Sequence, residues 1–255
     1  MSEGAWPESG SGEIVGTSAA LQQALALAKQ LGASDAAVLI AGERGSGKEL
    51  FARLIHRASQ RRNHSFVKVN CVTTSPELLE RTLFGLEGGA FDQAVKIGRV
   101  EMADEGTLFL HEITRFPLEL QPKLVRMLKR GETERLGNPR IIRVNVRLIA
   151  ATRHDLGKVV RDRLQPTLYD QFHASSIQIP PLRARREDIP LLAHYFMRKF
   201  AHRMNKHVET ITPEITQALL NHDWPGNVTQ LEHFIERSVI LTEGSALHAP
   251  LDELQ

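Results

Sequence analysis

One glycine-rich stretch has the residue types and spacing needed to hold a phosphate chain. The sequence "GERGSGK" at 42–48 follows an apolar run and opens a helical pattern. Glycines let backbone N–H groups close around phosphate oxygens, the start of a helix adds positive potential, and Lys48 can reach the terminal phosphates. The stretch predicts a phosphate-binding loop (P-loop). A tight strand-to-helix turn without a ligand is the alternative.

A second stretch, "EGTLFLHEIT" at 105–114, places two polar residues at the end of an apolar run. The run is typical of a buried strand, which would deliver His111 and Glu112 to a nucleotide site. The first of these residues is a histidine and not a carboxylate. The pattern therefore raises the question of whether the site hydrolyses a nucleotide or only holds one.

The elements that position these residues alternate between strand and helix. Apolar runs at 36–42, 65–71, 106–112 and 146–152 predict strands, and amphipathic segments such as 18–33 and 47–60 predict helices. In the first helix, Leu21, Leu25 and Ala28 share one face and Gly32 marks the end. This alternation predicts an α/β fold, with helices on both faces of a parallel central sheet in three layers.

The pattern becomes purely helical after about residue 183. Thr212 precedes Pro213, a combination that predicts a capped helix start. We therefore expect four regions: a disordered lead-in at 1–12, an α/β domain at 13–182, a small all-helical domain at 183–248 and a tail at 249–255.

Composition narrows the functional class. Apolar residues make up 42% of the 255, the net charge is +2, and no run is long enough to span a membrane. The charge is uneven along the chain, because segment 123–163 holds twelve Lys/Arg against four Asp/Glu. It is interpreted either as a solvated helix with loops or as a surface for phosphates or an acidic neighbour, including a nucleotide second messenger. The single cysteine, Cys71, excludes an internal disulfide and fits the cytoplasm.

Motifs along almost the whole chain resemble the AAA+ domain of sigma-54-dependent bacterial transcription activators. "GERGSGKE" resembles the family's P-loop, "ADEGTLFLHEI" its Walker B strand, "RLIAATRHDL" its sensor I strand and "WPGNVTQLEHFIERSVIL" its lid. The resemblance implies a P-loop AAA+ domain followed by a helical lid, commonly assembled as a hexameric ring. It implies ATP or ADP as ligand, with only weak support for Mg²⁺ and no other metal site.

The resemblance also assigns roles to single residues. Glu112 matches the carboxylate that polarises the attacking water, and Asn70 the asparagine that restrains it. An ordinary strand-end acid and a turn former remain the alternatives. The nucleotide-binding residues would be Gly42, Glu43, Arg44, Gly45, Ser46, Gly47, Lys48, Glu49, Ile14, Val15 and His111.

Several matched positions depart from the family pattern. His111 replaces the acidic Walker B residue, and Glu49 follows Lys48 where other P-loops offer Mg²⁺ a hydroxyl. Four positions lack the expected side chain: Gln165 and Gln171 at the arginine fingers, Thr229 at the sensor II arginine and Arg153 at the polar sensor I position. The first pore loop, GAFTGA in the family, has become Gly89, Ala90, Phe91, Asp92, Gln93 and Ala94.

These departures predict a nucleotide-binding regulatory or oligomerisation module in which hydrolysis and sigma-54 engagement are impaired. An active ATPase that remodels sigma-54 RNA polymerase and a scaffold that no longer binds nucleotide are the alternatives. The expected partners are further copies of the chain, a related activator subunit, RNA polymerase or a sigma factor. DNA would be contacted only through a domain that this sequence does not show.

Overall fold

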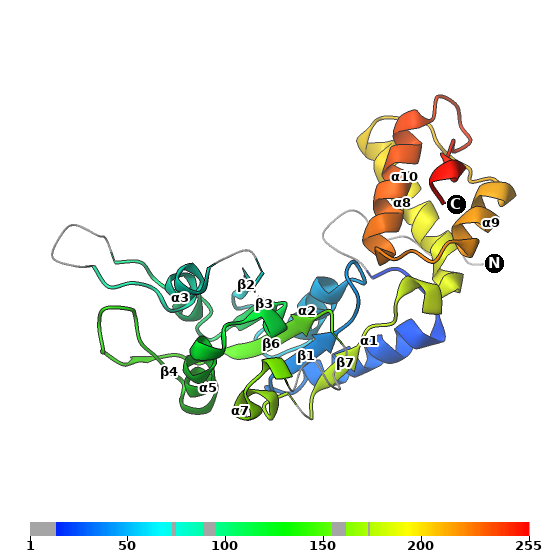
Figure 1. Ribbon diagram of the computed structural model, residues 1–255. Coiled ribbons are helices and arrows are strands. Elements are labelled where there is room, and N and C mark those ends of the chain that lie inside the picture. Colours follow the sequence, from blue (N-terminus) through cyan, green and yellow to red (C-terminus); the bar gives the residue numbers. More distant parts are fainter. Residues whose placement is uncertain (1–13, 73–74, 89–94, 155–161, 173, 255) are drawn as a thin grey trace.

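The computed structural model describes residues 14–72, 75–88, 95–154, 162–172 and 174–254 (Figure 1). The predicted lead-in at 1–12 and the first pore loop at 89–94 lie outside these ranges. The first part of the chain contains α1 (Ala19–Gly32), β1 (Val38–Ala41), α2 (Lys48–Arg57), β2 (Phe66–Asn70), α3 (Pro76–Phe84), α4 (Arg99–Met102) and β3 (Thr107–His111). It continues with α5 (Gln121–Arg130), β4 (Glu132–Thr133), β5 (Ile142–Arg143), β6 (Arg147–Thr152), α7 (Pro166–Tyr169) and β7 (Ser176–Gln178).

The central sheet has five parallel strands in the order β2-β3-β6-β1-β7. The four strands predicted from the apolar runs are confirmed as β1, β2, β3 and β6. The strand β7, a three-residue edge strand that pairs with β1, was not predicted from the sequence. The short antiparallel pair β4-β5 was not predicted either.

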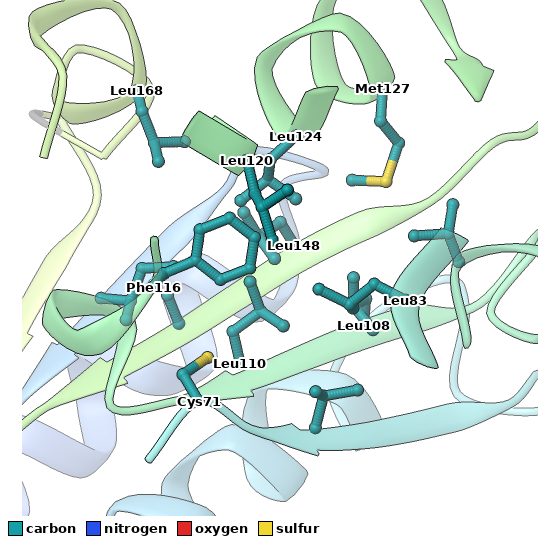
Figure 2. Close-up of a cluster of buried hydrophobic side chains, with 14 of the residues drawn as sticks. Cys71, Leu83, Leu108, Leu110, Phe116, Leu120, Leu124, Met127, Leu148 and Leu168 are labelled. Carbon is teal, nitrogen blue, oxygen red and sulfur yellow. The ribbon is translucent and has the colours of Figure 1, made fainter. Parts of the chain in front are cut away.

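Alternate residues of the strands pack on opposite faces of the sheet, which produces the three layers. Leu108, Leu110 and Leu148 belong to a core shared with α3 and α5, as Figure 2 shows around Phe116. Phe109 and the other strand residues that point to the opposite face of the sheet belong to a second core beneath α1 and α2. Since every residue of β3 from Thr107 to Leu110 is buried, the strand that leads to His111 is held on both sides.

The last part of the chain is helical. It comprises α8 (Ile189–Arg203), α9 (Pro213–Asn221) and α10 (Asn227–Leu241), preceded by two 3-10 turns at Leu182–Ala184 and Arg186–Asp188 and followed by one at Leu251–Leu254. The predicted cap is confirmed, because the side chain of Thr212 accepts from Ile215 N and Pro213 opens α9. The three helices pack around the buried Trp224, whose Nε1 donates to Leu219 O at 2.8 Å.

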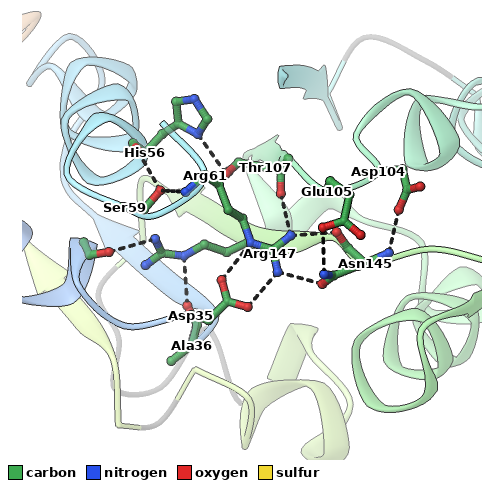
Figure 3. Close-up of polar contacts among 12 residues, drawn as sticks. Asp35, Ala36, His56, Ser59, Arg61, Asp104, Glu105, Thr107, Asn145 and Arg147 are labelled. Carbon is green, nitrogen blue, oxygen red and sulfur yellow. Dashed lines mark hydrogen bonds and ion pairs between the residues drawn. The ribbon is translucent and has the colours of Figure 1, made fainter. Parts of the chain in front are cut away.

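Two arginines fix the end of the sheet at which the strands begin, which is the end opposite the P-loop (Figure 3). Arg147, only 1% exposed, donates to backbone oxygens of Leu31, Gly32 and Ala36. Arg61 forms a two-pronged pair with Asp35, with Nη2–Oδ2 at 2.6 Å. Arg147 belongs to the basic segment 123–163, so part of that segment's charge serves the fold and not a surface.

Other charges of the basic segment are paired as well. Lys123 Nζ lies 2.5 Å from Glu80 Oε1, and Arg126 contacts Glu132 and Glu134. Arg135 bridges Glu87 and Glu101. These pairs favour the solvated-helix interpretation for the cations involved. Among the residues that the structure covers, no helix is both long and apolar enough to cross a membrane.

Candidate functional site: a nucleotide-binding loop beneath the helical lid

The P-loop connects the end of β1 to the start of α2, as the sequence predicts. Gly42 N donates to Thr152 O at 3.1 Å, which ties the loop to β6. Gly45 and Gly47 have φ angles of +75° and +99°, a backbone conformation that residues with a Cβ adopt at a cost. Gly47 caps α2, so the first amides of that helix have no intrahelical partner and point out of its N-terminus.

Lys48 is buried at the base of this loop. Its Nζ donates to Gly42 O at 2.7 Å and Glu43 O at 2.9 Å, and lies 3.9 Å from Glu112 Oε1. Burial lowers the pKa of Lys48, the nearby carboxylate of Glu112 raises it, and Arg153 lowers it further. A phosphate chain would replace the carbonyl oxygens as acceptors for this ammonium.

The loop fits the phosphates of a nucleotide. Ser46 Oγ is buried without a hydrogen-bond partner, and open space surrounds the Cβ position of Gly47. A hydroxyl without a partner, the amides at a helix start and a lysine, all within one seven-residue loop, are the donors that phosphate oxygens require. Ile14 and Val15, also predicted to bind the nucleotide, are half-buried: Ile14 packs on the core beneath α1 and α2, and Val15 on the lid core.

Glu112 lies directly after β3, in a left-handed conformation with φ of 61°. Its Oε1 faces Lys48, and its Oε2 accepts from the backbone N of Arg153 at 3.2 Å. The carboxylate is therefore held beside the phosphate-binding lysine. This is where a group that activates a water molecule for attack on the terminal phosphate would be needed.

Asn70 lies next to this site but makes a local bond. The register of β2 and β3 pairs Asn70 with His111. However, Asn70 Oδ1 accepts from Val72 N at 3.0 Å, which is the hydrogen bond of a turn-forming asparagine. The structure places Asn70 one strand from Glu112, and the proposed restraint of that glutamate stays a prediction.

His111 ends β3 as a half-buried imidazole. Burial lowers its pKa, the neighbouring Glu112 raises it, and Lys48 and Lys68 lower it again. Together these influences lower the pKa of the imidazole. The ring packs edge-on against Phe109 at a centroid distance of 6.3 Å. A neutral nitrogen ligand is a poor substitute for the oxygen ligands that Mg²⁺ prefers.

Contacts from the lid hold the P-loop from above, and the sequence analysis missed most of them. Arg183 donates to both oxygens of Glu43, at 2.5 and 2.8 Å, and Asn227 Nδ2 donates to Glu43 Oε2 at 3.1 Å. The hydrogen bond from Arg183 holds the pKa of Glu43 at about 2, although burial opposes the shift. The only sequence signals for these partners were a basic run at 183–186 and an asparagine that opens a helix.

The position predicted for sensor II also lies over the loop. Thr229 N approaches Gly45 O at 3.4 Å, and a Cβ on Gly45 would meet Gly226 O at 2.1 Å. Arg185 Nη2 donates to Ser46 O, which adds a buried cation from the lid. The lid therefore contacts the phosphate loop through backbone atoms and these side chains, whereas Thr229 contributes a backbone amide.

The two finger positions bond within their own surroundings. Gln165 caps α7, and its Nε2 donates to Leu118 O at 3.1 Å. Gln171 Nε2 donates to Thr167 O, one turn earlier, at 3.4 Å. The structure does not bring either amide to this chain's own P-loop, and the role of these two positions stays a prediction. Residues 89–94 lie outside the described part of the chain.

Comparisons with known proteins agree with this geometry. Residues 14–178 match the family described as the sigma-54 interaction domain, and residues 183–251 match the AAA+ ATPase lid domain. The chain is 49% identical over 246 residues to the formate hydrogenlyase transcriptional activator FhlA of Escherichia coli, which covers 95% of this chain and 36% of that protein. It is 48% identical to the DNA-binding transcriptional activator HyfR of the same organism, over 96% of this chain and 37% of that protein.

Solved structures give the same result. NtrX from Brucella abortus in complex with ATP superposes with a TM-score of 0.87 at 36% identity, covering 95% of this chain and 54% of NtrX. The complex of NtrX with ADP gives 0.85. This chain spans a little over a third of the two activators. It is a P-loop AAA+ domain with a helical lid, and it belongs to the sigma-54 interaction domain family of bacterial transcription activators.

Proposed function

We propose that this chain binds ATP or ADP through its P-loop, hydrolyses ATP poorly, and acts as a nucleotide-dependent regulatory or oligomerisation module. One observation carries the proposal: an intact phosphate cradle stands beside a half-buried imidazole, and not a carboxylate, at the end of β3. Lys48 and the unpartnered hydroxyl of Ser46 support binding. The complexes of NtrX with ATP and ADP support the choice of ligand.

Phosphoryl transfer depends on positioning and on positive charge around the terminal phosphate. Glu112 is in place to orient a water molecule, but the finger positions offer only the amides of Gln165 and Gln171. An arginine finger contributes about 10³–10⁵-fold in rate in enzymes that use one. We infer that a ring of identical copies lacks this charge, so a related activator subunit with arginines is the partner that could restore it.

Transcription regulation is the setting that the named relatives suggest, since FhlA and HyfR are both described as transcriptional activators. Engagement of sigma-54 or RNA polymerase would require the pore loop. There, Asp92 and Gln93 replace a hydroxyl residue and a glycine. We infer that this engagement is weakened, and that assembly with further subunits is the main activity of the chain.

An active ATPase is the second candidate, favoured by the 3.9 Å approach of Glu112 to Lys48. Steady-state ATP turnover across a range of protein concentrations separates the two. We expect turnover below about 0.1 per second, against about 1–10³ per second for typical enzymes. Faster turnover that is lost in Lys48→Ala would establish the ATPase instead.

Nucleotide binding is tested separately by thermal unfolding. ATP or ADP at about 100 times its Kd should stabilise the chain by about 2.7 kcal/mol, and Lys48→Ala should remove the effect. Absence of any shift at saturating nucleotide would favour a scaffold that no longer binds it. Light scattering with and without nucleotide then shows whether binding drives self-association.

A further inference from the structure

Glu49 follows the phosphate-binding lysine directly in the sequence, and both of its carboxylate oxygens form ion pairs. In the first turn of α2, its Oε2 lies 2.5 Å from Lys68 Nζ and its Oε1 lies 2.8 Å from Arg53 Nη2. Both oxygens therefore already have a charged partner. A metal ion at this point would have to displace a lysine or an arginine before Glu49 could become a ligand.

Three other side chains near Lys48 are bonded elsewhere or of the wrong type for a hard metal ion. Glu112 Oε2 accepts from Arg153 N, and Asn70 Oδ1 accepts from Val72 N. His111 offers an imidazole, whereas Mg²⁺ takes oxygen ligands in a near-octahedral arrangement. The donor set does not fit Mg²⁺.

The same region is rich in positive charge. Lys68 and His111 lie on the face of the sheet that α2 covers, because Lys68 pairs with Phe109 in register and Phe109 packs beneath α2. From there Lys68 reaches the first turn of α2 and lies close enough to His111 to lower the pKa of its imidazole. Arg153 follows β6 and is exposed next to Lys48 and Glu112. Lys48, Lys68 and Arg153 thus bring three cations to the N-terminus of one helix, where Glu112 lies beside Lys48 and Glu49 is paired with Lys68.

We propose that this P-loop takes its nucleotide free of divalent metal, with Lys68 and Arg153 supplying the countercharge that Mg²⁺ would otherwise bring. The inference rests on the proposed nucleotide binding and names the form of the ligand. Metal-free ATP carries two more negative charges than its Mg²⁺ complex. A helix N-terminus surrounded by three cations favours the more negative form.

Thermodynamic linkage turns this into a measurable quantity. If the protein adds no ligand to the metal, bound ATP holds Mg²⁺ no more tightly than free ATP does. By reciprocity the chain then binds ATP no more tightly with Mg²⁺ than without it. A protein that does coordinate the metal shows the opposite preference.

The experiment is isothermal titration calorimetry of the full 255-residue chain with ATP, in excess MgCl₂ and in excess EDTA. We expect the two Kd values to agree within about threefold, or the EDTA value to be the lower. Binding that is more than about threefold tighter with Mg²⁺ would overturn the inference while leaving the proposed function standing. Failure to bind in both buffers would instead refute the proposed function.

Matched variants test the residues. His111→Asp returns a carboxylate to the end of β3 and should make binding tighter in Mg²⁺ than in EDTA. A folded variant that stays indifferent to the metal would overturn the role given to His111. Lys68→Met and Arg153→Asn, at exposed positions, should weaken binding in EDTA more than in Mg²⁺, and equal losses in the two buffers would contradict their role as countercharges.

Discussion

The contact between the lid and the P-loop can be measured with two glycine variants that differ in one respect. Gly45 and Gly47 both have left-handed φ angles, +75° and +99°. A Cβ at Gly45 would lie 2.1 Å from Gly226 O, whereas nothing lies within 4 Å of a Cβ at Gly47. Gly45→Ala therefore combines backbone strain with a lid clash, and Gly47→Ala carries the strain alone.

The magnitudes follow from these contacts. A left-handed alanine costs about 1–2 kcal/mol relative to glycine, and both variants incur this. In Gly45→Ala the lid carbonyl must also move by about 1.3 Å to restore an ordinary van der Waals contact of 3.4 Å. That displacement loosens the bonds of Thr229 N to Gly45 O and of Asn227 Nδ2 to Arg44 O, each worth about 0.5–1.5 kcal/mol. We expect Gly45→Ala to be the more destabilised by about 1–3 kcal/mol.

The assay is thermal unfolding of both variants without nucleotide, so that effects on ligand binding do not enter. For a chain of this length, 1 kcal/mol corresponds to about 2–4 °C in Tm. Gly45→Ala should therefore unfold several degrees below Gly47→Ala, and limited proteolysis should cut first between the α/β domain and the lid. Equal Tm values, or a lower value for Gly47→Ala, would refute the contact inferred between Gly45 and the lid.

Two further predictions follow from the pKa shifts. The pKa of Glu43 is lowered from 4.5 to about 2, so its pair with Arg183 contributes stability that is present above pH 4.5 and lost as the pH falls towards 2. Since the side chains of the pair are 38% and 43% exposed, we expect the pair to contribute only about 1 kcal/mol to the free energy of unfolding. The measurement compares the unfolding free energies of Glu43→Gln and wild type at pH 7 and at low pH. A difference between the two proteins that does not depend on pH would contradict the pairing. Burial raises the pKa of Cys71 to about 12, so about one thiol in 10⁴ is ionised at pH 8. Ellman's reagent should therefore modify the chain only after denaturant is added. Rapid modification of the folded protein would show instead that Cys71 is accessible.

Local patterns were enough to predict most of the fold. The three inner strands β1, β3 and β6 are mostly apolar runs with almost every residue buried, which is the signature of strands covered on both faces. The cap formed by Thr212 and Pro213 depends on neighbouring residues alone and appears as predicted. The strand β7 was missed because three residues next to a proline carry too little pattern; its pairing with β1 decides its conformation.

Some features of the candidate site were likewise predictable from local sequence, and others were not. The P-loop, Lys48 and the placement of Glu112 after a buried strand were all readable from the sequence, because each depends on residues a few positions apart. The boundaries of the domains and the catalytic roles of single residues stay predictions. The histidine at the end of β3 was visible in the sequence, but the cations that surround it were not.

What only the tertiary structure decided is the set of partners brought together from distant parts of the chain. Arg183 lies 140 residues from Glu43, and Asn227 lies 184 residues from it, yet both bind its carboxylate. Lys68 meets Glu49 only because α2 packs on the face of the sheet to which the side chain of Lys68 points. The sequence by itself determined the elements and the phosphate loop, since these depend on local periodicity and backbone geometry. The charges placed around that loop depend on how strands and helices pack, and no local pattern encodes that packing.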